Sequence, residues 1–418
     1  MQMKSDYFIS VYLDTRREKQ NGNYPVKLRV FDSNIRKQKL YPTPFEFTTK
    51  EFDSIWNTAR PRKEYKEIRL KIQALENRAN EIAQNLNVFS FEQFERKLIR
   101  KVGEGLKVIY HYKLTIEELN KQNRLSTASS YECSQKALKE FVEVNTKQSY
   151  KFLSFFDIDK QWLNEFEDYM KISGRSITTT GIYLRPLKAI FNKAIADKDI
   201  EAEIYPFGKR KYQIPSSRKV KKALSKIQIK QLFETEPKIQ EQIKAKGFWF
   251  FSYNCNGMNI KDIALLKYKD LSDSKIKFYR AKTIYTSKTN LKPITIHLNG
   301  YIKDFIDKYG NDDKHPENYI FDILSNGLSI KEQQAKIKNF TRFINQHIKK
   351  LCKANNLPTD ISSYWARHSF ATIAMRKGAS LEFMQESLGH KDMSTTLNYF
   401  AGFDDESKKE FAESLMEF

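Results

Sequence analysis

The residues whose types and spacing indicate chemistry lie in residues 362–401, near the end of the 418-residue chain. Arg367 is followed directly by His368, His390 follows a leucine and a glycine, and Tyr399 stands nine residues after His390. A guanidinium binds a phosphate or carboxylate in a bidentate manner, and a tyrosine can act as a nucleophile. A guanidinium, an imidazole and a phenol on one rim would form a site for a phosphate group.

Three short helices are predicted to position these side chains. Ser362 is expected to cap a helix whose apolar residues share one face, which puts Arg367 in its first turn. The helix dipole favours an anion there rather than a cation, so a phosphate or carboxylate is expected beside the guanidinium. Residues 381–388 are predicted to form a second helix. Ser394 is predicted to cap a third that carries Tyr399.

This combination of segments resembles the tyrosine recombinase (phage integrase) family, which has R-H-[ST]-F-A, then L-G-H, then a tyrosine nine residues later. The resemblance implies an enzyme that cuts and rejoins DNA through a 3′-phosphotyrosyl intermediate, without a metal, ATP or any other cofactor. Arg367, His390 and Tyr399 match the family's catalytic residues. Taken singly, each has an ordinary structural explanation, as an ion-pair arginine, a turn histidine and a tyrosine at the core edge. Their joint spacing favours catalysis.

Two positions depart from the family pattern. The family's first arginine opens a helix in a G-[LM]-R segment, and residues 257–259 read Gly-Met-Asn here, so Asn259 replaces it. The family's first histidine lies three residues before the second arginine, where this chain has Tyr364. Removing one donor to a phosphoryl oxygen typically slows catalysis about a hundred- to a thousandfold. Asn259 and Tyr364 can still donate neutral hydrogen bonds to a phosphate.

A predicted strand over residues 275–283 carries basic residues that could compensate for the arginine missing at position 259. Lys282 is the best match for the family's hairpin lysine, the general acid for the 5′-oxygen, and Lys288 is the alternative. Residues two apart on a strand project to the same face, so Arg280 is predicted to point with Lys282 and to replace the arginine missing at Asn259. The alternative is an ion pair across the hairpin. Integrases of conjugative elements of the Bacteroidetes are similar in these segments.

Composition restricts the partners. Lys and Arg number 73 against 51 Asp and Glu, a net charge of +22, which favours a polyanion such as nucleic acid or an anionic membrane surface. No apolar stretch approaches a membrane span and the first residues do not form a signal peptide, so we expect a cytoplasmic protein, nucleoid-associated when bound to DNA. The three cysteines are unclustered, which predicts neither disulfides nor a zinc site. No Walker loop or H-E-x-x-H motif is present.

The chain is longer than a single domain with one hydrophobic core, so several domains are expected. The strand-like and helix-like spacings of apolar residues predict a multidomain α+β fold. Alternating strands and one helix at the N-terminus resemble an arm-type DNA-binding domain, and the helices that follow resemble a SAM-like core-binding domain. A mainly helical catalytic domain with a small antiparallel sheet comes last. The predicted boundaries are 1–101 for the arm domain, 107–208 for the core-binding domain, 209–222 for a basic linker and 223–418 for the catalytic domain.

Hydroxyl groups and backbone amides at a helix start bind phosphates well, as do basic residues on a sheet or a linker. The alternatives to DNA binding are that the threonines at the helix start form an ordinary N-cap region and that the basic face of the sheet is simply solvated. The predicted DNA contacts are Thr178, Thr179 and Thr180 at a helix start, Arg36 and Lys37 in the sheet, and Lys219, Lys221 and Lys222 in the linker.

Double-stranded DNA is the expected partner, with a homo-tetramer forming on it and an accessory DNA-bending protein possible. The family implies that the amphipathic tail after Tyr399 docks on a neighbouring protomer, and the alternative is packing on its own domain. Two other functions are compatible with the sequence. The changes at Asn259 and Tyr364 allow a catalytically silent DNA-binding protein, and a type IB topoisomerase uses similar chemistry.

Overall fold

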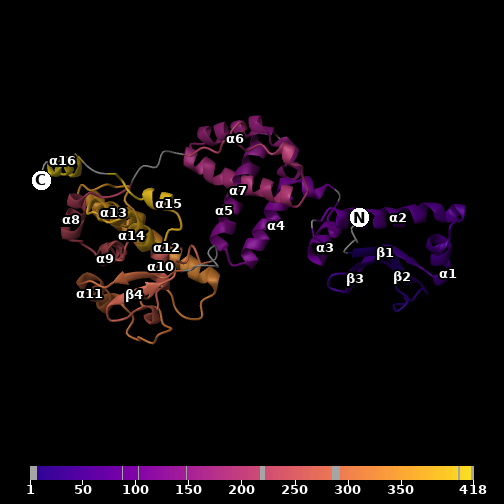
Figure 1. Ribbon diagram of the computed structural model, residues 1–418, viewed down its shortest axis with the longest axis horizontal. Helices are drawn as coiled ribbons and strands as arrows, with labels where there is room; N and C mark the ends of the chain where they lie inside the picture. Colours follow the sequence, from indigo (N-terminus) through magenta and orange to yellow (C-terminus); the bar gives the residue numbers. More distant parts are fainter. Residues whose placement is uncertain are drawn as a thin grey trace. The chain divides into compact units, whose positions relative to one another are not determined.

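The computed structural model describes residues 7–86, 88–101, 103–146, 148–216, 222–284, 292–402 and 405–415. Two compact units, Met1–Ser217 and Arg218–Phe418, make up the chain (Figure 1). Within the described ranges, no helix is both long enough and apolar enough to cross a membrane.

The first unit begins with an antiparallel sheet of strands β1 (Tyr7–Leu13), β2 (Tyr24–Asp32) and β3 (Lys37–Phe47), in that spatial order. Alternation of apolar residues directs one face inward, where α2 (Lys66–Gln84) and α3 (Phe91–Ile99) cover it (Figure 1). β3 contains two prolines, which are tolerated because it is an edge strand. Short helical turns join these elements at Thr49–Phe52, Asp53–Asn57 and Lys63–Tyr65.

Four helices form the rest of the first unit around an aromatic core. Phe141 packs edge-to-face on Phe166 at 5.4 Å between ring centroids, and Phe155 packs on Phe191 at 4.8 Å. Ser176 caps the last helix by accepting from the amide of Thr179 at 3.2 Å. The helices are α4 (Val108–Lys121), α5 (Leu125–Phe141), α6 (Lys160–Ile172) and α7 (Ile177–Ala196).

The second unit is built around α9 (Gln240–Asn254), whose aromatic run is buried on several sides. Phe248 and Phe251 pack into the core beneath the small sheet of β4 (Lys275–Phe278) and β5 (Ile294–His297), and Trp249 packs into a second core beside α13. The other helices are α8 (Lys226–Glu234), α10 (Ile260–Leu265), α11 (Gly300–Tyr309), α12 (Ile330–Ala354), α13 (Ser363–Arg376), α14 (Leu381–Leu388), α15 (Met393–Leu397) and α16 (Asp405–Ser414). The predicted multidomain α+β fold is confirmed.

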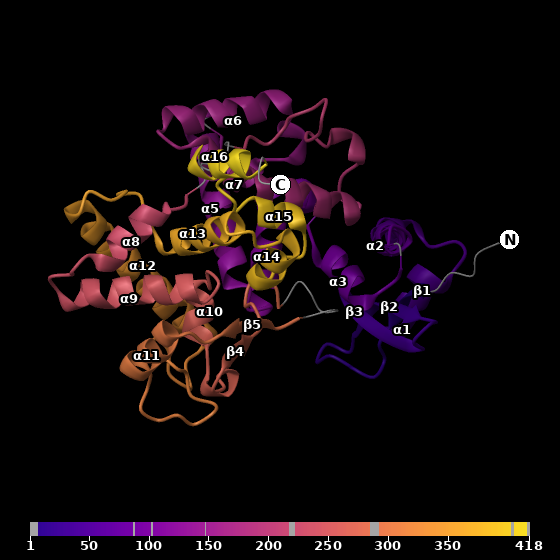
Figure 2. The same cartoon turned by 60° about the vertical axis from the view of Figure 1, so that its left-hand side comes forward.

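Two glycines allow close packing where the segments with the predicted catalytic residues meet. Gly257 has φ of +68°, and a Cβ there would lie 2.6 Å from the Cα of Arg367. Gly389 ends α14 with φ of +60°, and a Cβ there would lie 2.6 Å from Ile294 on β5. Figure 2 shows α14 beside β5. A side chain at either position would be strained and would push these elements apart.

Three local predictions, in two segments, are wrong. β4 ends at Phe278, and Arg280 lies in a turn in which the amides of Thr283 and Ile284 donate to its carbonyl at 3.0 and 3.2 Å. The argument that Arg280 and Lys282 share one face of a strand therefore fails. Tyr399 does not lie on the third helix, because α15 ends at Leu397. Its amide donates to the carbonyl of Thr396 at 2.9 Å, which continues the helix as a single turn. Ser394 lies inside α15 rather than at its cap.

Candidate active site

Arg367 is the most enclosed charged group of the site, with 3% of its surface exposed. Its Nη1 donates to the carbonyl of Gly257 at 3.0 Å, and its Nη2 donates to the carbonyl of Leu388. Burial, with a contribution from nearby Arg280, lowers the pKa of Arg367 to about 10. The guanidinium therefore remains charged at neutral pH. Its Nε is buried and has no protein acceptor within the described residues.

Arg280 reaches the same place from the turn after β4. It is 7% exposed, and its Nη1 donates to the carbonyl of Gly389 at 3.3 Å. Asp262 on α10 fixes this turn, because its Oδ1 accepts from the amide of Ala281 at 2.9 Å. Burial raises the pKa of Asp262, while Arg280 and Arg367 act against that rise. Asp262 thus places a buried carboxyl group near two buried guanidinium groups.

The phenol of Tyr399 is held between two imidazoles. The ring of His368 stacks on it at 4.7 Å and 27°, and the ring of His390 at 4.9 Å and 30°. The guanidinium carbon of Arg367 lies 5.2 Å from the centre of the phenol ring. The Tyr399 hydroxyl is hydrogen-bonded to the hydroxyl of Tyr364.

Electrostatics favour ionisation of Tyr399 over Tyr364. Burial alone would raise the pKa of Tyr399, but the hydrogen bond from Tyr364 and the charges of Arg367 and Arg280 outweigh it, so this pKa lies below its ordinary value. Burial and the bond to Tyr399 raise the pKa of Tyr364 well above its ordinary value. In the shared hydrogen bond, Tyr364 is therefore the donor to a developing Tyr399 phenolate.

His390 is a neutral imidazole with a defined tautomer. Its Nε2 lies 3.1 Å from Nη2 of Arg367, which can only donate, so Nε2 accepts. The ring proton is then on Nδ1, which donates to Oγ1 of buried Thr396 at 3.0 Å. Burial and the charges of Arg367, Arg280 and Lys282 lower the pKa of His390 to about 3.

A pocket of about 290 Å³ opens beside these groups. Asn259, Tyr364 and Arg367 line it, together with Ser363 and other residues of α10, α12 and α13. Lys282 is exposed in the turn after β4, and its charge reaches His390. The structure therefore brings together all seven predicted catalytic residues: Asn259, Arg280, Lys282, Tyr364, Arg367, His390 and Tyr399. The alternative general acid, Lys288, lies outside the described residues.

Three partners of the predicted residues were missed by the sequence analysis: Asp262, His368 and Thr396. The spacing of Asp262 and Thr396 in the sequence does not indicate that either contacts a catalytic residue. His368 had a usable signal, because it lies four residues after Tyr364 and so shares a helix face with it. The two rings meet edge-to-face at 5.0 Å.

The predicted DNA contacts are scattered over the chain. Thr178 is exposed and Thr179 is half-buried in the first turn of α7. Thr180 is fully buried, with its hydroxyl directed to the carbonyl of Ser176 at 3.4 Å. The prediction for Thr180 is therefore wrong, because the fourth residue after the cap of this helix faces the core.

The basic candidates are exposed where the structure describes them. Arg36, in the turn before β3, and Lys37, the first residue of β3, are both exposed. Lys222 is exposed and lies 3.7 Å from a carboxylate oxygen of Asp360. Lys219 and Lys221 lie outside the described residues.

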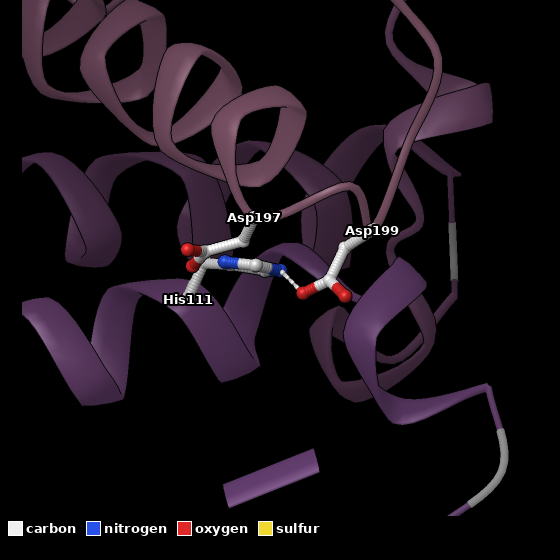
Figure 3. A group of neighbouring side chains, drawn as sticks. All are labelled: His111, Asp197 and Asp199. Atoms are coloured by element: carbon white, nitrogen blue, oxygen red, sulfur yellow. Dashed lines mark ion pairs between the residues drawn. The ribbon is translucent and has the colours of Figure 1, made fainter. Parts of the chain in front are cut away.

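One group of side chains in the described ranges has the composition of a metal site, namely His111, Asp197 and Asp199 (Figure 3). Asp199 is already paired with Arg100 at 2.7 Å and with Lys97 at 3.3 Å. Nε2 of His111 lies 2.8 Å from a backbone carbonyl, which can only accept, so this nitrogen carries a proton. These contacts describe an ion-pair network that ties α3 to α4 and to the end of α7, rather than a metal centre.

Comparisons with known proteins agree with this fold. The phage integrase family pattern matches residues 222–406, and the phage integrase SAM-like domain matches residues 107–214. A tyrosine recombinase of Thermosipho africanus is 24% identical over 283 residues, which cover 63% of this chain and 90% of that protein. A tyrosine recombinase of Pseudothermotoga lettingae is 26% identical over 189 residues, and tyrosine recombinase XerD of Staphylococcus aureus is 30% identical over 169 residues. The chain matches only 59% and 56% of the lengths of the latter two.

Among solved structures, the integrase of transposon Tn1549 in complex with a circular intermediate DNA has a similar fold, with a TM-score of 0.50 and 18% identity. The match covers 74% of this chain and 99% of that one. The fold is therefore that of a tyrosine recombinase. This chain belongs to the phage integrase (tyrosine recombinase) family, as the R-H-S-F-A, L-G-H and tyrosine segments predicted.

The low pKa of His390 has a consequence for stability that can be measured. The unfolded chain binds a proton at this residue more readily than the folded chain, so stability falls as pH drops from about 6.5 toward 3 and is unaffected above that range. Histidine-labelled protein, with His390→Gln used to assign the signal, should show no titration of His390 between about pH 5 and about pH 8 by NMR. A midpoint near that of a free histidine would contradict the lowered pKa of His390.

Proposed function

We propose that this protein is a site-specific DNA recombinase, or integrase, that cuts and rejoins DNA through Tyr399. The Tyr399 hydroxyl loses its proton to solvent, and the resulting phenolate attacks the scissile phosphorus. The phosphorus–5′-oxygen bond breaks, and the 5′-oxygen takes a proton from the general acid and leaves as a hydroxyl group. The product is a 3′-phosphotyrosyl bond, and attack by a 5′-hydroxyl in the reverse direction rejoins a strand. The observation that carries this proposal is the phenol of Tyr399 beside two buried guanidinium groups, hydrogen-bonded to a donor that favours its ionisation.

Arg367 and Arg280 are proposed to bind the two non-bridging oxygens of the phosphate. Both are buried, and the Nε of each has no acceptor among the described residues. Such an arrangement suits an anion that accumulates charge in the transition state. Arg280 would thereby replace the arginine that is absent at Asn259, and Asn259 would donate a neutral hydrogen bond from the pocket wall.

Lys282 is proposed as the general acid for the leaving 5′-oxygen, with Lys288 as the alternative. An ammonium group supplies both a point charge and a transferable proton. His390, being neutral, would orient Arg367 through its Nε2.

Replacement of the nucleophile is the direct test of the function. On a nicked suicide duplex, wild-type protein should form a covalent DNA adduct that migrates slowly in denaturing gels. Tyr399→Phe should form none while binding DNA as tightly as wild type, because only the hydroxyl is removed. Wild-type protein that binds DNA but never forms an adduct would instead support the catalytically silent DNA-binding protein.

Arg280→Ala tests the proposed replacement for the missing arginine. Loss of one donor to a phosphoryl oxygen should lower the single-turnover cleavage rate about a hundred- to a thousandfold. Lys277→Ala is a matched control, because it removes the same charge from an exposed position on the adjacent strand β4. Equal rates for the two variants would reject the role of Arg280.

Tyr364 is proposed to donate a hydrogen bond that stabilises the Tyr399 phenolate. Cleavage should accelerate as pH rises through the pKa of Tyr399, which lies below its ordinary value. Tyr364→Phe removes the donor, so the midpoint of the pH–rate profile should move to higher pH, and the rate at neutral pH should fall about tenfold or more. Tyr279→Phe, at an exposed tyrosine in the neighbouring turn, should leave the profile unchanged. An unshifted midpoint in Tyr364→Phe would exclude this role.

We propose double-stranded DNA in the cytoplasm as the substrate, gripped by the predicted arm domain (1–101), core-binding domain (107–208), linker (209–222) and catalytic domain (223–418). Thr178, Thr179, Arg36, Lys37 and the linker lysines Lys219, Lys221 and Lys222 would bind phosphates. The similarity of the Gly-Met-Asn and Lys282 segments supports a mobile-element integrase of the Bacteroidetes type. Substituting alanine for any one of these basic residues should lower the slope of log affinity against log salt concentration by about one unit.

A homo-tetramer on DNA is proposed, with the tail beyond Tyr399 docking on a neighbouring protomer and an accessory protein bending the DNA. Deletion of residues 404–418 should then abolish the synapsis of two sites, because it removes the link between protomers, while binding to a single site persists. Native gels with one and two labelled duplexes would measure this. Unchanged synapsis would rule out docking in trans.

A further inference from the structure

One face of α13 carries three polar residues at four-residue spacing: His368, Thr372 and Arg376. All three point to the main chain that follows the phenol of Tyr399. Nδ1 of His368 lies 3.4 Å from the carbonyl oxygen of Tyr399, and Oγ1 of Thr372 donates to the same oxygen at 3.4 Å. Oγ1 of Thr372 also accepts from the amide of Ala401 at 3.1 Å.

Arg376 completes the row. Its Nε and Nη2 both donate to the carbonyl oxygen of Gly402, at 3.0 and 2.8 Å. Gly402 has φ of +92°, a conformation that residues with a Cβ rarely adopt. The direction of this carbonyl toward Arg376 therefore depends on glycine at position 402.

These hydrogen bonds replace those that regular structure would supply. α15 ends at Leu397, so the segment after it has no helix or strand to satisfy its carbonyl groups. A carbonyl can only accept, so the Nδ1 of His368 is a donor and its ring orientation is fixed. The same ring stacks on the phenol, so His368 holds Tyr399 by both its main chain and its side chain.

We propose that His368, Thr372 and Arg376, the α13 clamp, are positioning residues that fix the nucleophile against the phosphate-binding arginine of the same protomer. Arg367 and Tyr364 lie on the same helix, so the α13 clamp sets the distances among phenol, donor and guanidinium along one rigid element. A misplacement of about 1 Å can cost about a hundredfold in rate, so a fixed backbone matters to catalysis. This inference rests on the proposed cleavage by Tyr399.

The α13 clamp should govern cleavage and not DNA binding. Arg376→Ala and Thr372→Val should each lower the single-turnover rate of adduct formation at saturating suicide duplex about ten- to a hundredfold, with unchanged DNA affinity. Thr372→Ser keeps the hydroxyl and should restore most of the rate. Lys377→Ala removes the same charge from the next residue, the exposed C-cap of α13, and should cleave at the wild-type rate.

Three results would overturn the clamp. The first is a cleavage rate for Arg376→Ala equal to that of Lys377→Ala. The second is a defect that appears wholly in DNA affinity, and the third is a rate defect that Thr372→Ser fails to restore. Thr372 is buried, so Thr372→Val could fail to fold, which its melting curve would show. In that case the cleavage rate of Arg376→Ala, at a half-buried residue, tests the clamp by itself. Wild-type protein that forms no adduct refutes the proposed function and the clamp together, whereas equal rates in all clamp variants refute the clamp only.

Discussion

Two guanidinium groups buried close together, with one carboxyl group to offset them, are the constraint on which this site depends. Burial and the nearby charge of Arg280 both disfavour the charged form of Arg367, which is why its pKa falls to about 10. Asp262 is itself destabilised as an anion by burial. An anion placed between the arginines would relieve this repulsion. A phosphodiester gains negative charge on its oxygens as the nucleophile attacks, so relief would be greatest in the transition state.

Main-chain carbonyl groups hold the two arginines in this unfavourable arrangement. Those of Gly257, Leu388 and Gly389 accept their hydrogen bonds, and the last two stand at the C-terminal end of α14, where the helix dipole favours cations. The carbonyls can come this close only because Gly257 and Gly389 lack side chains. Backbone geometry, rather than a set of surface ion pairs, therefore defines where a phosphate would bind.

The sequence predicted the helical periodicities and the small N-terminal sheet well, because buried faces repeat at fixed intervals along helices and strands. It also predicted that Arg367, His390 and Tyr399 would meet, from their joint spacing. The reasoning for Arg280 was wrong although its location near the site was right, since the chain turns after Phe278 and a turn leaves no periodic signal. Thr180 and Tyr399 were mispredicted for the same reason. Both lie near a helix end, where a shift of one residue moves a side chain between the core, the surface and a turn. Asp262 was missed because its partners Ala281 and Arg367 are remote in sequence. Thr396 lies six residues after His390 but on a helix too short to show a periodic pattern. His368 was missed although its four-residue spacing from Tyr364 was a usable signal.

The central claim is that the phenol at position 399 becomes covalently attached to DNA. The most direct measurement is to trap full-length protein on a suicide duplex, digest it with a protease and identify the peptide that carries the nucleotide by mass spectrometry. The account predicts a single modified peptide with the 3′-phosphate on Tyr399. Attachment at any other residue, Tyr364 included, would contradict it.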